Sequence, residues 1–482
     1  MARARLRYLS DADKQFVHEQ TVRVLEEVGI AFNTPQAVDL VAEAGAQVDR
    51  DALTAKLPWS LVEACLEKVP RDILLAGRDA SNDVVVDDDA LVTTSDGTAT
   101  YLMDDRTGER LEGSAAGLAR VMRLFDALPE IDYLWPSLSA RDLDPLTANL
   151  EIQIISLQNS TKHIQDEVRT PEFVQPLVDI LEAVAGSSLW KRPIFSIIHC
   201  TVAPLQHDRH MTEASIGMAR AGAPVLVLPM ALMGTTGPMT PLSTAIVNMA
   251  ELLSAVVLFE LAAPGCQIVS GIGSAAADMR TGFYLCGASE AVLVNIIGVE
   301  MSRFYGLRSL ASCGTTDAKQ VNYQAGVEAA LTGVPCAMAG AEILLFFGLL
   351  DGATIVSPAK TVLDSDTMGA VRRLVRESPV DASTVLFDDI AEVGTGGHFL
   401  GRKSTREFSR AGELWQPSLF QRLPFESYVG RGLLDEAIER AEQIMASHEV
   451  PPFPDDVQRH VDGVVARHRA AGGGHVAPDS RP

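Results

Sequence analysis

The sequence lacks the compact motifs by which many enzyme classes are recognised. It has no HExxH zinc motif, no GxSxG nucleophile elbow, no P-loop and no GxGxxG after a strand-like segment. No lysine is placed to form a Schiff base at a strand end. The six cysteines are dispersed, with no CxxC and no Cys/His pairing at zinc spacing. We therefore expect no bound metal, and we expect the cysteines to be reduced thiols of a cytoplasmic protein.

Basic residues and long apolar runs are also scarce. Sixty-three acidic against 40 basic residues give a net charge of −23, which argues against a nucleic-acid or anionic-membrane partner. The basic start of the chain lacks the apolar segment of a signal peptide. The longest apolar runs are interrupted before the roughly 18–20 residues that span a bilayer. At 482 residues and 47% hydrophobic, the chain is long enough for one large α/β domain with an appended one.

The most informative segment is 225–240, which reads VLVLPMALMGTTGPMT. Its first four residues form a short apolar run, typical of a strand buried on both faces of a parallel sheet. The run ends at Pro229 and passes through a Gly/Thr/Met loop into a helical pattern. Such loops after parallel strands are where α/β folds place their chemistry. The methionines predict a soft, uncharged lining without a nucleophile.

Helical and strand-like patterns divide the chain. Helices are predicted at 11–30, 35–45 and 58–68, followed over 72–111 by short β-rich pieces that suggest an antiparallel hairpin sheet. After Gly113, helical patterns alternate with short apolar strands, as a (β/α)₈ barrel requires. The eight candidate strand ends are Trp135–Ser137, His163–Gln165, His199–Thr201, Pro229–Met230, Gly271, Ser312–Gly314, Phe346–Gly348 and Ser357.

We predict an α/β protein whose catalytic domain is a (β/α)₈ TIM barrel with an N-terminal helical and β-hairpin extension. The expected boundaries are 1–113 for the extension, 114–400 for the barrel, 401–466 for a C-terminal helical segment and 467–482 for a disordered tail. The tail is rich in Gly and Pro. Apolar helices such as LLSAVVLFELAA exceed what one barrel needs to cover its sheet, so we also expect a homo-oligomer.

Segment 225–240 and four further stretches, in the same order, resemble the trimethylamine methyltransferase superfamily of corrinoid-protein-dependent methyltransferases. Together the resemblance covers residues 9–465. The four stretches are YLSDADKQFVHEQTVRVLEEVGIAF at 8–32, DMRTGFYLCGASEAVLVN at 278–295, RFYGLRSLASCGTTDAKQVNYQAGVEAAL at 303–331 and VGTGGHFLGRKSTREF at 393–408.

The resemblance implies methyl transfer from an amine to the Co(I) of a cobalamin (corrinoid) carried by a separate small protein. Trimethylamine-specific members carry a pyrrolysine in the barrel mouth. This chain has only the twenty common residues, so it resembles the non-pyrrolysine branch, whose characterised members demethylate quaternary amines such as betaines. We expect such an amine as substrate. Cob(I)alamin is itself a strong nucleophile, so a site without one in the protein suits this reaction.

Residues at the predicted strand ends and loops supply the candidate site. The catalytic candidates are Asp317, Gln324, Glu328 and His163. The substrate-binding candidates are Gly97, His199, Met230, Met233, Cys313, Phe346 and Phe347. The candidates for contact with the corrinoid are Gly234, Thr236, Gly237, Gly271, Gly397 and His398.

Several of these residues also have a purely structural interpretation. Each histidine could be a hydrogen-bonded core residue, and Asp317 with Gln324 and Glu328 could form a capped, salt-bridged helix start. Many relatives in the resembled family carry a histidine in the strand where Phe346 and Phe347 stand here. An aromatic ring at that strand end would either face a trimethylammonium group or pack in the core. Two other functions stay open: a barrel lyase or isomerase with a histidine general base, and a non-catalytic methylammonium-binding protein.

Overall fold

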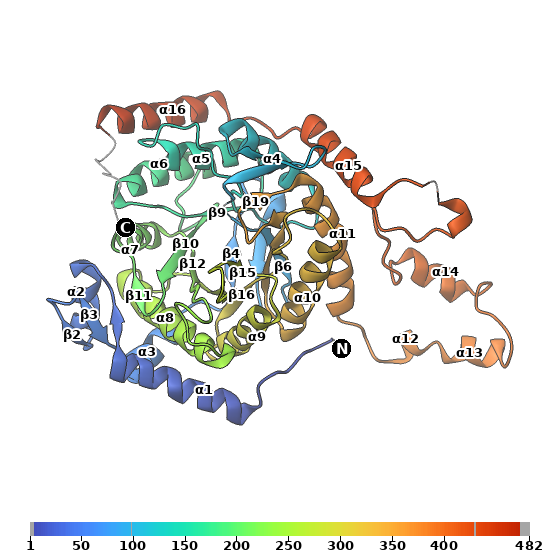
Figure 1. Cartoon of the computed structure of the whole chain (residues 1–482), viewed down its shortest axis with the longest axis horizontal. Coiled ribbons are helices and arrows are strands. Elements are labelled where there is room, and N and C mark those ends of the chain that lie inside the picture. Colours follow the sequence, from blue (N-terminus) through green and yellow to red (C-terminus); the bar gives the residue numbers. More distant parts are fainter. Residues whose placement is uncertain (1–3, 98, 429, 473–482) are drawn as a thin grey trace.

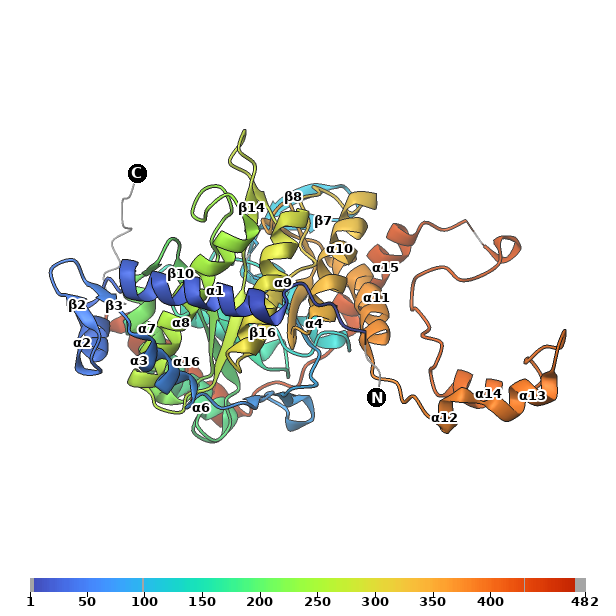
Figure 2. The ribbon, with the colours of Figure 1, turned by 90° about the horizontal axis from the view of Figure 1, so that it is seen from below.

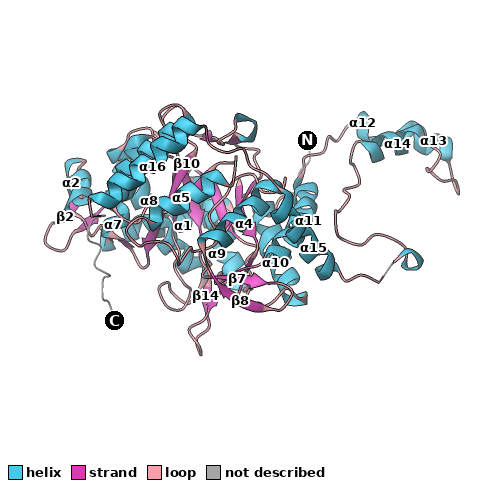
Figure 3. Cartoon of the chain, turned by 90° about the horizontal axis from the view of Figure 1, so that it is seen from above, coloured by secondary structure: helices cyan, strands magenta, loops and turns pink. Residues whose placement is uncertain are grey.

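The computed structural model describes residues 4–97, 99–428 and 430–472 and shows a mixed α/β fold. A parallel sheet lies at the centre of the body and helices surround it (Figures 1 and 3). Most of its strands are short and buried on both faces, as parallel strands under helices are. They run in the order β9 (Ile164–Asp166), β10 (Phe195–Val202), β12 (Val225–Leu228), β13 (Ile268–Ile272), β16 (Arg308–Ser312), β17 (Ile343–Phe347) and β6 (Val92–Ser95).

A short extended segment lies between the two ends of this series. Tyr133 forms a single parallel bridge with Thr94 of β6, and Leu134 forms one with Ile164 of β9. The Leu134 N–H donates to the carbonyl of His163 at 2.9 Å. Two adjacent residues therefore bridge the two end strands of this series, Tyr133 at β6 and Leu134 at β9.

Eight helices follow the strands along the chain and cover the outside of the sheet (Figure 1). They are α4 (Ala115–Ala127), α5 (Ala148–Gln158), α6 (Val174–Ala185), α7 (Arg209–Ala221), α8 (Pro241–Ala262), α9 (Ser289–Phe304), α10 (Tyr323–Ala339) and α11 (Pro358–Val375). Helix α8 is long and apolar enough to cross a membrane by length and composition, but 78% of its apolar window is buried inside the protein. A helix that is apolar all round is buried in a core, and here α1 (Asp11–Arg23) and α3 (Trp59–Leu66) cover its outer side.

The N-terminal unit extends the central sheet. Ser10 and Asp13 form a capping box at the start of α1, and Gly29, at φ 91°, follows the π-helical turn Val24–Val28. The three helices predicted from sequence are present here, with α1 ending earlier than expected. The elements are α1 (Asp11–Arg23), β1 (Ile30–Ala31), α2 (Pro35–Glu43), β2 (Gln47–Asp49), β3 (Thr54–Lys56) and α3 (Trp59–Leu66), and β1 joins β11 (Gln206–His207).

The β-rich region 72–111 is not one antiparallel sheet, as predicted, but three structures. Strands β4 (Ile73–Leu75) and β5 (Val84–Val86) form a hairpin whose apolar side chains pack in one cluster with side chains of the central strands. Hairpin β7 (Tyr101–Asp104) and β8 (Glu109–Glu112) continues into β19 (Ile355–Val356) and β18 (Leu349–Leu350). Between these hairpins in the sequence, β6 pairs in parallel with β17 in the central sheet. All four residues of β6 are buried, as is typical of a central parallel strand. The predicted strand end at Ser357 is likewise wrong, since β19 lies outside the central sheet.

The C-terminal part starts with a segment that projects from the body (Figures 1 and 2). It contains α12 (Ala382–Val385), α13 (Phe387–Val393) and α14 (Lys403–Arg410). Helix α15 (Leu433–Ser447) then packs against α4 and α11, and α16 (Asp455–Ala470) packs against α6. The tail predicted from 467 begins inside α16, and residues 473–482 lie outside the described residues. The remaining elements are β14 (Ala276–Ala277), β15 (Tyr284–Leu285) and the 3-10 turns Ala80–Asn82, Pro171–Phe173 and Phe425–Ser427.

Candidate functional site

A cavity of about 480 Å³ lies at the carboxyl ends of the central strands. Each strand of the sheet, and the segment at Tyr133, contributes a residue at or just after its end. In parallel sheets with helical crossovers this is the end where sites form. The lining residues are Asp96, Gly97, Trp135, Ser139, Glu167, Arg169, Cys200, Leu228, Met230, Gly273, Tyr284, Ser312, Leu345, Gly352 and Ala353.

Two aromatic rings form part of the wall. The Trp135 indole N–H donates to Asp166 Oδ1 at 3.1 Å, and its backbone N–H donates to Ser95 Oγ at 2.8 Å. Gly97 permits this position, because a Cβ there would lie 2.5 Å from Trp135 Nε1. The Tyr284 hydroxyl donates to the Gly273 carbonyl at 3.3 Å, and burial raises the pKa of Tyr284, which keeps it neutral. Electron-rich ring faces of this kind attract cations.

Charged groups of both signs complete the wall. Asp96 is buried and accepts hydrogen bonds from Thr315 Oγ1 at 2.9 Å and the Gly97 N–H at 3.0 Å. Burial raises the pKa of Asp96 to about 6, although these bonds oppose the rise. Glu167 is half-buried and Arg169 exposed. We call this cavity the aromatic chamber. Its lining includes two acidic residues and one arginine, so its net charge is negative once Asp96 is ionised.

Asp166 stands behind the tryptophan and fixes its orientation. Its other oxygen accepts from Gln153 Nε2, so both carboxylate oxygens have partners. Burial raises the pKa of Asp166 to about 7. Because Asp166 bonds the indole edge and lies outside the cavity lining, it positions Trp135 and does not meet the ligand.

Of the predicted substrate-binding residues, Gly97 and Met230 line the cavity. Gly271, predicted as a corrinoid contact, lies in β13 just below it. A Cβ at Gly271 would fall 2.7 Å from Leu228 Cδ1. A side chain at position 271 would therefore displace Leu228, which lines the cavity.

The predicted catalytic trio fastens a loop and does not line the cavity. Asp317 Oδ1 accepts from the Cys286 N–H at 3.0 Å and the Gly287 N–H at 3.3 Å. Glu328 Oε2 accepts from the Asp317 N–H at 2.8 Å, and Glu328 Oε1 from Gln324 Nε2 at 2.8 Å. Burial raises the pKa of Asp317. These residues support the loop that carries Tyr284, two residues before Cys286.

The two candidate histidines are buried away from the cavity. His163 Nε2 lies 2.9 Å from Ser196 Oγ, and burial lowers the pKa of His163 to about 4. His199 Nε2 lies 2.9 Å from His207 Nδ1, and burial lowers the pKa of His199 well below its usual value. Each ring is fully buried with both nitrogens in hydrogen bonds. The structure therefore places both as neutral core residues, the structural alternative considered above.

The predicted cation-binding phenylalanines also point elsewhere. Leu345 lines the cavity, so the next residue, Phe346, turns outward and packs against Gly314 and Gly333. The ring of Phe347 contacts that of Phe346 edge to face, with the ring centroids 5.6 Å apart, and it is fully buried. Cys313 and Met233 are buried and outside the lining. The sequence analysis thus located a strand that does contribute to the cavity, but it chose Phe346 and Phe347, which do not line it, in place of Leu345.

The other predicted corrinoid contacts fall into two places. Gly234, Thr236 and Gly237 lie in the loop after β12, where Thr236 Oγ1 accepts from the Leu232 N–H at 2.9 Å. Gly234, at φ 96°, packs between Met239 and Met279. Gly397 and His398 lie on the projecting segment, away from the strand ends (Figure 2).

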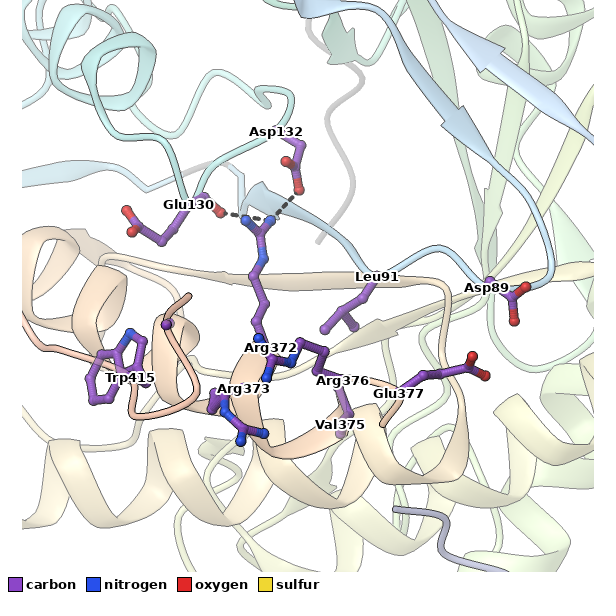
Figure 4. Close-up of a pocket in the computed structure, with 12 residues that line it drawn as sticks. Asp89, Leu91, Glu130, Asp132, Arg372, Arg373, Val375, Arg376, Glu377 and Trp415 are labelled. Carbon is purple, nitrogen blue, oxygen red and sulfur yellow. Dashed lines mark hydrogen bonds and ion pairs between the residues drawn. The ribbon is translucent and has the colours of Figure 1, made fainter. Parts of the chain in front are cut away.

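A second cavity, of about 630 Å³, lies near the opposite ends of the strands, beside the root of the projecting segment (Figure 4). Asp89 and Leu91 precede β6, and Glu130 and Asp132 precede Tyr133. Its charges are largely paired: Arg372 Nη2 contacts Asp132 Oδ2 at 2.5 Å. It does not reach the aromatic chamber.

Comparisons with known proteins agree with this architecture. The sequence profile described as Trimethylamine methyltransferase (MTTB) matches residues 2–473. The trimethylamine methyltransferase MttB of Desulfitobacterium hafniense is 28% identical over 95% of this chain and 92% of its own length. The glycine betaine methyltransferase of D. hafniense strain Y51 is 26% identical over 95% and 96%.

Among solved structures, the monomethylamine methyltransferase MtmB of Methanosarcina barkeri covers 96% of this chain and 88% of its own. Its TM-score is 0.52 at 13% identity, which shows a shared fold. The resemblance identified from five motifs is confirmed by the profile match over nearly the whole chain. The chain belongs to the trimethylamine methyltransferase family and is a methyltransferase.

Proposed function

We propose that the protein transfers a methyl group from a betaine-type quaternary amine to the Co(I) of a corrinoid carried by a separate protein. The observation that carries this proposal is the chamber in which the rings of Trp135 and Tyr284 lie with the carboxylates of Asp96 and Glu167. Aromatic faces and nearby negative charge are the features that recognise quaternary ammonium groups. The chamber belongs to a member of a methyltransferase family.

The proposed architecture around it is a closed (β/α)₈ barrel. The parallel bridges of Tyr133 and Leu134 to the two edge strands support closure, with this segment as the eighth strand. The eight helices that cover the strands support it as well. Closure would bring all eight strand ends around one mouth, which fits the composition of the chamber lining.

Arg169 supports a zwitterionic substrate. Arg169 lines the same chamber as Asp96 and Glu167, and an arginine pairs well with a carboxylate in two-point geometry. A betaine carries both a trimethylammonium group and a carboxylate. Its cationic end would face Trp135 and its anionic end Arg169. The glycine betaine methyltransferase among the relatives is consistent with this class.

The chain's own residues bind and orient the donor. A corrinoid supplies the nucleophile when its carrier protein docks. The aromatic walls hold the ammonium so that one methyl points toward the mouth, and they exclude water from it. As the C–N bond breaks, both electrons stay on nitrogen and a neutral tertiary amine leaves. No proton transfer is needed, so buried neutral histidines are compatible with this reaction.

The rim of the mouth supports docking of a partner-borne corrinoid. Met230, Met239 and Met279 are exposed by 37%, 59% and 61%, although methionine is usually buried. Flexible thioethers suit a large apolar ring and its carrier. Gly234, in the loop with Thr236 and Gly237, lies next to two of them, since a Cβ there would fall 2.8 Å from the sulfur atoms of both Met239 and Met279. We further propose that the protein works in the cytoplasm, where its six free cysteines stay reduced.

The test is a spectroscopic assay of Co(I) consumption with a panel of quaternary amines and a cognate corrinoid protein. We expect consumption with a betaine-type donor. Turnover of another substrate without any cobalamin, with a bell-shaped pH profile, would instead support the lyase or isomerase. Tight betaine binding without turnover, even with reduced corrinoid protein supplied, would identify a binding protein.

The acidity of Asp96 gives a pH-dependent prediction. Since its pKa is about 6, the group is mostly neutral at pH 5 and mostly anionic at pH 7. We expect binding of a quaternary ammonium to strengthen about tenfold as pH rises through this range, equivalent to ~1.4 kcal/mol. Calorimetric titration at several pH values measures it.

Two controls isolate the charge at this position. Asp96→Asn should bind weakly and with little pH dependence. A neutral isostere of the ligand, with carbon in place of nitrogen, should bind the wild-type protein equally at each pH. An unchanged pH dependence in Asp96→Asn would show that another group is responsible.

A further inference from the structure

The segment that projects from the body has no core of its own. We call residues 376–432 the arm. None of its described residues is buried, yet it forms α12, α13 and α14 and extends well away from the barrel (Figures 1 and 2). Isolated helices this short are unstable in water. The arm therefore needs an external surface to hold its structure.

Its surface composition points the same way. Phe387 is 68% exposed, Leu400 80% and Phe425 85%. Large apolar side chains gathered on one exposed segment mark an interaction site. Those exposed between 380 and 428 are Val380, Val385, Phe387, Ile390, Phe399, Leu400, Leu414, Leu423, Phe425 and Tyr428.

The arm is nevertheless organised, so it is not a simple linker. Arg402 pairs with Asp389 Oδ1 and with Glu392 Oε2, both at 2.6 Å, which ties α14 to α13. Ser404 Oγ donates to Asp389 Oδ2. These polar contacts fix the fold of the tip while its apolar side chains face outward.

The root of the arm is fastened to the body. Glu413 accepts from Arg373 Nη2 at 2.5 Å and from Arg376 Nη2 at 2.6 Å. The buried carboxylate of Asp366 accepts from the N–H groups of Leu419 and Phe420 at 2.7 and 2.8 Å. The arm thus leaves the body from a fixed point, beside the cavity shown in Figure 4.

We infer that a second copy of this chain covers the arm. If the proposed function holds, the protein that carries the corrinoid is the alternative partner. That protein must leave after each turnover, and the apolar residues of the arm would then be exposed again. The ten exposed apolar side chains of one arm, at about 100 Å² of accessible surface each, would bury on the order of 1,000 Å² per arm. Two exchanged arms would together bury about 2,000 Å², which is the size of a permanent interface. The carrier would make a smaller, transient contact.

The body also offers a surface near the arm's root for the partner's arm. Helices α10 and α11 pack together on the side from which the arm leaves (Figure 1). Leu331 on α10 is 54% exposed and Leu374 on α11 is 50% exposed. In a two-fold pair each copy presents the same surfaces to the other. Reciprocal exchange of arms would cover these leucines and both arms together.

The experiment measures mass by light scattering at micromolar concentration, with no methyl donor or corrinoid present. We expect an even multiple of one chain for the wild type and a single chain for Phe387→Asp combined with Leu400→Asp. Val85→Asp places the same charge at an exposed apolar position outside the arm, in β5 (53% exposed); this control should stay associated. Far-UV circular dichroism checks folding.

Limited trypsin digestion of the wild type gives a second readout that needs no variant. Lys403, Arg406 and Arg410 are exposed on the arm of one chain, and association should protect them while the monomeric variant is cut there. A monomeric wild type, an odd-numbered assembly, an unchanged mass in the arm variant, or rapid cleavage of the wild-type arm would each overturn the inference. Failure of methyl transfer would leave these results unaffected.

Discussion

Replacing Trp135 by alanine should lower kcat/KM for a quaternary amine about 30-fold. A cation–π contact in a desolvated site is worth ~2 kcal/mol, and each 1.36 kcal/mol is about tenfold in rate. The ring lines the chamber and is held by Asp166, so its removal both deletes a cation-binding face and admits water. Steady-state assays with donor titration, together with calorimetric binding of the donor, measure the loss.

Two variants separate the ring from its surroundings. Trp135→Phe keeps an aromatic face but loses the N–H bond to Asp166, so it should fall between the wild type and Trp135→Ala. Phe346→Leu changes a buried ring that packs against Gly333, outside the chamber. It should alter stability with little change in KM. A larger effect on donor binding from Phe346→Leu than from Trp135→Ala would contradict the assignment of the site.

The sequence predicted the elements that have a clear local signal. The strand Val225–Leu228 and its loop lie where predicted, because a buried apolar run followed by proline and glycine is unambiguous. Strand β6 was assigned to a hairpin sheet because its sequence, VTTS, carries no pattern that distinguishes a central from an edge position. Only its pairing with β17, some 250 residues away in sequence, reveals its place.

The site was predicted less well, for a geometric reason. Adjacent residues on a strand face opposite sides, so an error of one position exchanges Leu345, which lines the chamber, for Phe346, which does not. Trp135 stands at a strand end that the sequence did predict, and the alternation from Tyr133 could have identified it as inward-facing. Tyr284 lies within a resembled motif, but its approach to Gly273 depends on the long-range fold.

The largest expected effect on stability comes from a buried ion pair under the mouth. Lys360 Nζ contacts Asp364 Oδ2 at 2.6 Å and donates to the Gly314 carbonyl at 2.8 Å. Asp364 also accepts from the Gly348 N–H at 2.8 Å. Both side chains are at most 5% exposed. The pair thus joins the loops that follow β16 and β17 to the start of α11.

Lys360→Met should reduce the free energy of unfolding by about 3–5 kcal/mol, because it leaves the buried Asp364 charge without a partner. The double variant with Asp364→Leu should regain part of this loss, since it removes the unpaired charge. Chemical denaturation monitored by circular dichroism measures both. Equal stability of the single and double variants would show that the unpaired charge is not the cause.

The dependence of this loss on pH has a defined sign. Burial already raises the pKa of Asp364 above its usual 3.8, and removing Lys360 raises it further. A group whose pKa is raised in the folded state favours folding at pH below its unfolded pKa, and that contribution is lost as pH rises through the folded value. The deficit of Lys360→Met relative to wild type should therefore be small near pH 4 and grow toward neutral pH. Lys360 also lowers the pKa of Asp96, so in Lys360→Met the pH at which a quaternary ammonium begins to bind should move upward, a shift in binding that lost stability alone would not produce.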